Sequence, residues 1–234
     1  MQWYEDEVRA VEERIKVGQI PRHPVAFYGS SSIRLWNTLA SDLALPNALN
    51  LGFGGSTLEA CAYFFERLVV PAAPASLVVY AGDNDLGDGR SPENVLTFFR
   101  SLADQVHTRL PGIPFAFISI KPSPARLGII DRIRRTNDLI RREIGQRKIS
   151  QSDAGCFISI FEAMLDDRGK PRASLFLEDG LHLSPAGYRV WAAVLANYRN
   201  QIFNTQSDQC NPAQISSKQG EARVSQMVQP SARP

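Results

Sequence analysis

The sequence predicts an α/β protein of three-layer α/β/α architecture, in which a doubly wound parallel sheet of about five strands lies between two layers of helices. Short apolar runs alternate along the chain with segments of helical periodicity, a pattern typical of parallel sheets with helical crossovers. Residues 76–81, SLVVYA, contain an unbroken apolar run, as expected of a strand covered on both faces. Right-handed crossovers would then place helices on both sides of the sheet.

Helices and strands alternate from the first residues to about residue 198. An N-terminal helix is indicated by apolar residues at i, i+4, i+7 and i+11, namely Tyr4, Val8, Val11 and Ile15. Apolar runs predict strands at 25–28, 47–51 (the weakest), 76–81, 114–120 (PFAFISI) and 156–161 (CFISIF). Helical periodicity between and after them predicts helices at 57–68, 92–110, 127–146 and about 185–198.

Length and composition fit one globular domain. The chain has 234 residues, 44% of them hydrophobic, which is enough for one large core, and we expect the domain to span residues 1–203. Residues 204–234 are rich in Gln, Ser and Pro without periodicity and are expected to form a disordered polar tail. No apolar stretch approaches the roughly 20 residues of a membrane helix. Acidic N-terminal residues and three widely spaced cysteines lead us to expect a cytoplasmic protein with reduced thiols.

One segment, residues 126–148, is rich in arginine, although the net charge of +2 is too small to indicate a nucleic-acid partner by itself. An apolar stripe at helical spacing runs through it, formed by Ile130, Ile133, Ile140 and Ile144, with Asn137 completing the stripe. We interpret the arginines as the solvent-exposed face of an amphipathic helix. The alternative is a face that binds anions or nucleic acid.

The residues after the first strand are Gly29, Ser30, Ser31 and Ser32. Ligands of an open parallel sheet bind beyond the carboxyl ends of its strands, so polar residues at these ends are candidate site residues. The glycine permits a tight turn, after which a serine would point into the crevice. The alternative is that a serine only caps the helix that follows.

The second strand leads into GFGGST, residues 52–57. A dinucleotide-binding fingerprint is excluded because Gly54 and Gly55 are adjacent and because this turn follows the second strand instead of the first. The glycines do expose backbone N–H groups near a helix start, which suits a negatively charged oxygen. A plain turn is the alternative.

The third strand ends in GDNDLGDG, residues 82–89. The glutamate that closes an EF-hand loop is absent, and no metal site is predicted here. The side-chain amide of Asn84 can donate a hydrogen bond to an oxyanion. The acidic residues Asp83, Asp85 and Asp88 are expected to form turns and helix caps.

A histidine and a carboxylate precede the last predicted helix, in LEDGLHLSPAGY. Ser184 has the features of an N-cap, so Asp179 and His182 are expected in the preceding loop. A carboxylate three residues before a histidine can hydrogen-bond the ring and fix its tautomer. The other two histidines, His23 and His107, lie in a loop before the first strand and in a helical pattern. His182 is therefore the candidate base, and the four clusters together supply the groups needed for acyl transfer through a serine.

These blocks, in this order, resemble the SGNH hydrolases, also called the GDSL esterase/lipase family. The resemblance covers about residues 25–188. The family's Gly-Asp-Ser block is matched by Gly29-Ser30-Ser31, with Trp36 in the expected register, and the Gly-x-Asn-Asp block by residues 82–85. The Asp-x-x-His block is matched by residues 179–182. Ser30 departs from the family pattern because it replaces the aspartate, which is not a member of the triad.

The resemblance implies a flavodoxin-like sheet of order 2-1-3-4-5 and no cofactor. It implies that Ser31 is the nucleophile, His182 the base and Asp179 its orienting acid. It further implies an oxyanion hole formed by the N–H groups of Ser31 and Gly55 and by the Asn84 amide.

We expect a serine esterase acting on a small-molecule ester, with no nucleic-acid or membrane partner. Short acyl esters, acetylated sugars among them, are favoured because no long insertion resembles a lid. Arg34, Phe53 and Lys121 are candidates for lining the substrate pocket. A thioesterase or acyltransferase with the same triad is the nearest alternative. A non-catalytic binding protein and a nucleotide-binding module are less favoured, the latter because of the imperfect glycine pattern.

Overall fold

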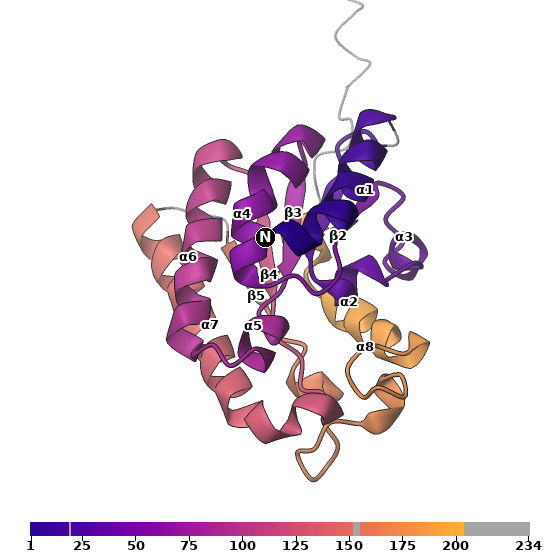
Figure 1. The fold of residues 1–234 in the computed structure, drawn as a ribbon, viewed down its shortest axis with the longest axis vertical. Coiled ribbons are helices and arrows are strands. Elements are labelled where there is room, and N and C mark those ends of the chain that lie inside the picture. Colours follow the sequence, from indigo (N-terminus) through magenta and orange to yellow (C-terminus); the bar gives the residue numbers. More distant parts are fainter. Residues whose placement is uncertain (19, 152–154, 204–234) are drawn as a thin grey trace, which may run out of the picture.

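Five parallel strands form one sheet in a computed structural model that describes residues 1–18, 20–151 and 155–203 (Figure 1). The strands are β1 Val25–Gly29, β2 Ala48–Gly52, β3 Ser76–Tyr80, β4 Phe115–Ile118 and β5 Gly155–Ile158. Their order is β2-β1-β3-β4-β5 and every pairing is parallel. The predicted fold class and strand order are confirmed. The predicted tail, residues 204–234, lies outside the described residues.

Helices cover both faces of the sheet. They are α1 Glu5–Lys16, α2 Ser31–Arg34, α3 Leu39–Asp42, α4 Leu58–Leu68, α5 Asp83–Gly87, α6 Pro92–Arg109, α7 Ile130–Gln151 and α8 Pro185–Ala196. Short 3-10 turns occur at Gln2–Tyr4, Val70–Ala72, Pro124–Ile129, Glu162–Met164 and Ala173–Leu175, and a π-helical turn at Arg199–Phe203. Core residues of α1, α4, α6 and α7 pack on one face, and those of α2, α3 and α8 on the other. Helices α4, α6 and α7 lie side by side in Figure 1.

The strands are buried on both faces, and alternate side chains enter the two halves of the core. In β1, Ala26 and Tyr28 pack under the layer that contains α4, while Val25 and Phe27 pack under the layer that contains α8. This is the period-2 geometry of a strand. Because each face is covered, the sequence of β1 is apolar throughout instead of alternating.

The fourth and fifth strands are shorter than predicted. Both ends of the Asn137 side chain bond the backbone of Ile120: its Oδ1 accepts from the Ile120 N–H at 2.7 Å, and its Nδ2 donates to the Ile120 carbonyl at 2.9 Å. Just past β5, the N–H of Ile160 donates to the Ser119 hydroxyl at 3.0 Å. Beyond the ends of β4 and β5, where the apolar runs of the sequence continue, hydrogen bonds with side chains therefore replace the strand-to-strand backbone hydrogen bonds. The short helices α3 and α5 were not predicted because neither is long enough to show periodicity.

Arginines of the basic segment pair with acidic residues on α6 and α7. The Arg135 guanidinium contacts Glu93, and that of Arg147 contacts Asp104 at 2.8 Å and Glu143 at 3.0 Å. The exposed Arg135–Glu93 pair supports the interpretation of an exposed amphipathic face, whereas the Arg147 side chain is largely buried. No helix in the described part of the chain is both long and apolar enough to cross a membrane.

Candidate active site

The candidate site residues that follow β1, β2 and β3 lie at the carboxyl edge of the sheet, because these three strands are neighbours. Gly29 at the end of β1 pairs with Gly52 of β2 and with Tyr80 of β3. The turn after β1 requires glycine, because Gly29 has φ +135° and a Cβ there would lie 1.9 Å from the Tyr80 carbonyl oxygen. The chain therefore turns directly from the strand into α2. The loops after β2 and β3 begin beside it.

The three serines differ in accessibility. Ser30 and Ser32 are buried, with 2% and 1% of their surface exposed, whereas Ser31 is only half-buried. The Ser30 N–H donates to the Tyr80 carbonyl at 2.9 Å, which locks the turn. Ser30 has the extended backbone of an N-cap, but its hydroxyl makes no cap hydrogen bond. Ser31, the first residue of α2, is therefore the most accessible of the three serines.

His182 connects Ser31 to Asp179. The Nε2 of His182 lies 3.1 Å from the Ser31 Oγ, and its Nδ1 lies 2.6 Å from the Asp179 Oδ2. An ionised carboxylate can only accept hydrogen bonds, so the Nδ1 of His182 carries the proton. Its Nε2 can then accept a hydrogen bond from the Ser31 hydroxyl. The two contacts form the chain serine–histidine–aspartate that the sequence predicted, across a separation of 151 residues.

A tight turn holds Asp179 against the ring. Its Oδ1 accepts from the N–H groups of Leu181 at 2.8 Å and His182 at 2.9 Å. The hydrogen bond from the His182 side chain, followed by these two backbone bonds, lowers the pKa of Asp179 to about 2. Asp179 therefore stays ionised at any pH at which ester hydrolysis is ordinarily measured. It can orient His182 and stabilise its protonated form.

Two of the three predicted oxyanion donors, Gly55 and Asn84, line a cavity, whereas Ser31 does not. Gly55 is exposed and has φ +66°, and Asn84 is half-buried at the start of α5. The Asn84 Nδ2 donates one hydrogen to the Ser56 carbonyl at 3.0 Å, which orients the amide and leaves its second hydrogen available. The cavity has a volume of about 330 Å³ and is lined by Trp3, Tyr4, Gly54, Gly55, Asn84 and Asp88. Sequence reasoning missed Trp3 and Tyr4, because nothing in the local pattern places the N-terminus beside this loop, and it assigned Asp88 only to a turn or helix cap.

Two predicted pocket-lining residues are corrected by the structure. Lys121 has only 2% of its surface exposed, and its ammonium donates to the Tyr80 hydroxyl at 3.1 Å and to the Asp83 carboxylate. Burial is the largest single influence and would lower the pKa of Lys121, but the charge interactions and hydrogen bonds with Asp83 and Tyr80 together outweigh it, and the pKa is raised. Phe53 is fully buried, 5.6 Å from Tyr4 between ring centroids. Both are core residues, whereas Arg34 is partly exposed.

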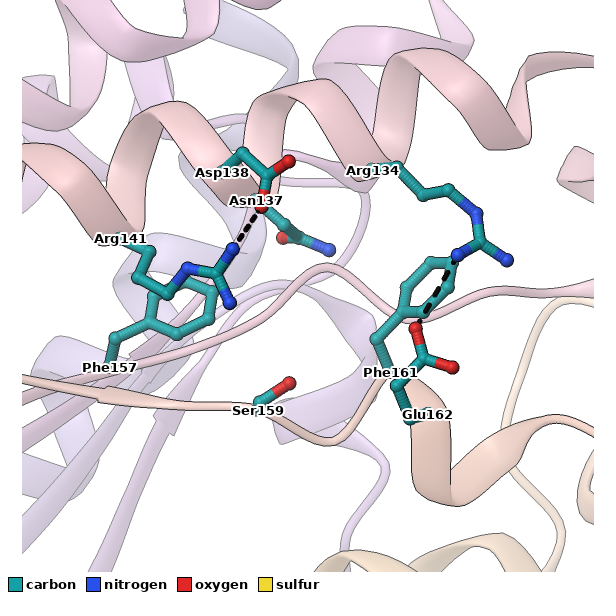
Figure 2. A pocket seen from close by; sticks show the side chains of 8 residues that line it. All are labelled: Arg134, Asn137, Asp138, Arg141, Phe157, Ser159, Phe161 and Glu162. Carbon is teal, nitrogen blue, oxygen red and sulfur yellow. Dashed lines mark hydrogen bonds and ion pairs between the residues drawn. The ribbon is translucent and has the colours of Figure 1, made fainter.

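A second cavity, of about 190 Å³, lies between α7 and the chain that follows β5 (Figure 2). It is lined by Arg134, Asn137, Asp138, Arg141, Phe157, Ser159, Phe161 and Glu162. The Arg141 guanidinium pairs with Asp138, and that of Arg134 pairs with Glu162 at 3.4 Å and lies over the Phe161 ring. Both cations are neutralised within the cavity, and none of the predicted site residues lines it. Among the described residues, no cluster of three or more His, Cys, Asp or Glu could hold a metal ion.

The architecture and this edge of the sheet place the chain among three-layer α/β/α hydrolases. The chain belongs to the GDSL-like lipase/acylhydrolase family, whose model matches residues 24–190. It is therefore a hydrolase that acts on ester bonds. No curated protein matches the chain in sequence.

Several solved structures share the fold. A GDSL-like lipase from Bacteroides thetaiotaomicron VPI-5482 superimposes with a TM-score of 0.67 at 20% identity, over 83% of this chain and 97% of that one. A family 3 carbohydrate esterase from Clostridium thermocellum has a TM-score of 0.59 at 20% identity, over 76% and 96%. A member of the lipolytic G-D-S-L family from Veillonella parvula DSM 2008 has a TM-score of 0.61 at 17% identity, over 76% and 99%. At these identities the likeness concerns the fold.

Proposed function

We propose that the protein is a serine esterase that hydrolyses carboxylic esters through an acyl-enzyme intermediate. The observation that carries this proposal is the contact of the Ser31 hydroxyl with His182 at 3.1 Å and of His182 with Asp179 at 2.6 Å. His182 takes the proton from the Ser31 hydroxyl as the Ser31 Oγ attacks the ester carbonyl. His182 then gives that proton to the leaving alkoxide, and Ser31 retains the acyl group. Water, activated by His182, releases the carboxylic acid and restores the serine.

The charge on the carbonyl oxygen in this reaction requires fixed donors. The N–H groups of Ser31 and Gly55 and the side-chain amide of Asn84 are the donors that we propose. Supporting this, Gly55 and Asn84 line the same cavity, and the Asn84 amide is already oriented by the Ser56 carbonyl. Donors held before the reaction need no reorganisation as the charge develops.

Short acyl esters, including acetylated sugars, are the proposed substrates. The cavity beside Gly55 and Asn84, at about 330 Å³, lies at the small end of the range for ligand sites. Trp3 offers an exposed apolar surface there and Asp88 a carboxylate, a combination that suits a neutral hydroxylated substrate better than an anionic one. The carbohydrate esterase among the structural neighbours points the same way. Transfer of the acyl group to an acceptor alcohol, or attack on a thioester, would use the same residues.

A fluorophosphonate probe tests the nucleophile directly. We expect one covalent adduct on the native protein, mapped by peptide mass spectrometry to Ser31, because this is the serine in contact with His182. Heat-denatured protein is the control and should remain unlabelled. An adduct on Ser30 or Ser32, or no adduct on active protein, would contradict the assignment.

Replacement of Asn84 by alanine is expected to lower kcat by about 10²- to 10³-fold with little change in KM, because a donor to the transition-state oxygen is lost. The loss corresponds to about 3–4 kcal/mol. Steady-state kinetics on p-nitrophenyl acetate measure both constants. Thermal unfolding shows whether loss of the Asn84 bond to the Ser56 carbonyl has also destabilised the fold. A variant with normal kcat would remove Asn84 from the proposed oxyanion hole.

A further inference from the structure

Helix α1 contacts the proposed oxyanion loop, although it lies outside residues 24–190 that match the family. The Tyr4 hydroxyl, just before the helix, donates to the Gly55 carbonyl at 3.2 Å. The carboxylate of Glu7, on the first turn of α1, accepts from the Gly54 N–H. The two bonds are made to the Gly54 N–H and the Gly55 carbonyl, which are the backbone groups that flank the Gly54–Gly55 peptide. The N–H of that peptide is the proposed oxyanion donor.

The same carboxylate also faces the nucleophile helix. An oxygen of Glu7 lies 3.5 Å from the Nε of Arg34, the last residue of α2, which begins at Ser31. The two side chains are 39% and 44% exposed, so the ion pair itself is weak. The bond from the Gly54 N–H is the stronger contact because it is a charge-assisted hydrogen bond, whereas the contact with Arg34 is a longer ion pair. Glu7 thus joins the oxyanion loop to the helix that carries the nucleophile.

The position of α1 does not depend on Glu7. Val8 and Val11 are buried in the core. The Arg67 guanidinium binds Glu5 at 2.8 Å and Glu12 at 2.7 Å, which fixes the helix against α4. Removal of the Glu7 carboxylate should therefore leave α1 in place. Gly54 leaves room for this contact, since a Cβ there would lie 2.6 Å from a Glu7 oxygen.

We propose that Glu7 and Tyr4 are positioning residues that hold the Gly54–Gly55 peptide with its N–H directed at the reacting carbonyl oxygen. This inference rests on the proposed function, because it concerns the alignment of that oxyanion hole. Without the carboxylate, the Tyr4 bond to the Gly55 carbonyl would be the one left of these two bonds. The Gly55 N–H would then be less well aligned with the transition state, while the ground-state ester would bind as before.

The test uses the full chain and the variants Glu7→Ala and Glu7→Gln. We expect Glu7→Ala to lower kcat on p-nitrophenyl acetate by between about tenfold and a hundredfold, with KM within about twofold, as for a small misplacement of a catalytic group. Glu7→Gln keeps an oxygen that accepts from Gly54 and should restore kcat to within about threefold of the native protein. Tyr4→Phe tests the second bond and should show a smaller fall in kcat.

Glu12→Ala is the matched control, because Glu12 lies on the same helix and binds Arg67 instead of the loop. We expect a lower melting temperature and an unchanged kcat. Equal losses of kcat in Glu7→Ala and Glu12→Ala would show that undocking of α1 is the cause and would overturn the proposal, as would a native kcat in Glu7→Ala. Fluorophosphonate labelling of the native protein separates these outcomes from failure of the proposed function, which would abolish labelling and hydrolysis in the native protein itself.

Discussion

Replacement of Ser31 by alanine is expected to lower kcat/KM for ester hydrolysis by at least about 10⁴-fold, because it removes the atom that forms the acyl-enzyme. The Ser31 side chain is half-buried and its contact is with His182, so the fold should survive the change. The measurement is a panel of p-nitrophenyl esters and acetylated sugars of varied acyl length. Thermal unfolding of the variant checks that the protein is intact. The same panel run on the native protein ranks the proposed substrates.

The neighbouring serines provide the controls for this experiment. Ser32 is buried, and its carbonyl accepts from the Tyr188 hydroxyl at 3.0 Å, so Ser32→Ala leaves that bond in place. We expect Ser30→Ala and Ser32→Ala to retain activity within about tenfold, since neither hydroxyl contacts His182. If one of them abolishes hydrolysis while Ser31→Ala does not, the register of the nucleophile is wrong.

Replacement of Lys121 by methionine is expected to lower the free energy of unfolding by about 3–5 kcal/mol. The change leaves the buried Asp83 carboxylate without the ammonium that donates to it, and Arg126 at 3.5 Å replaces that contact only in part. Folded protein therefore holds a poorly compensated charge in its core. Urea denaturation followed by circular dichroism measures the loss.

The double variant Lys121→Met/Asp83→Leu is the control for the buried pair. It removes both charges, so much of the lost stability should return. A single variant that loses less than about 1 kcal/mol would show that the pair contributes little. The pair also bears on the site, because Asp83 immediately precedes Asn84 and starts α5.

Local pattern predicted the fold class and the polar clusters that contain Ser31, Asp179 and His182, whereas the strand order and the choice of Ser31 among the three serines came from the family resemblance. Apolar runs fixed the strands, and polar residues after β1 and β3 and before α8 proved to share one edge of the sheet. The boundaries of β4 and β5 could not be read locally, because the side chains that bond the backbone past them are distant in the sequence: Asn137 of α7 past β4, and Ser119 past β5. Such side-chain to backbone bonds have no periodic signature in the sequence.

Lys121 and Phe53 were misplaced for a related reason. A lysine after a strand is usually exposed, and its burial here depends on Asp83, which is 38 residues earlier in the chain. Phe53 was placed in the pocket by its position next to the glycines, yet it packs against Tyr4 of the N-terminal segment. Both outcomes depend on tertiary contacts between distant segments. The contacts of Glu7 with Gly54 and Arg34 belong to the same category.

The span of 151 residues between Ser31 and His182 has a consequence for the order of events during synthesis. A nascent chain that has released β1 to β4 from the ribosome contains Ser31 but lacks the proposed base His182 and the proposed orienting residue Asp179. Those arrive with the turn before α8, whose Tyr188 hydroxyl bonds the backbone of Ser32. Under the proposed mechanism, ester hydrolysis begins only when the last helix docks. The onset of activity during translation or refolding would time that final docking step.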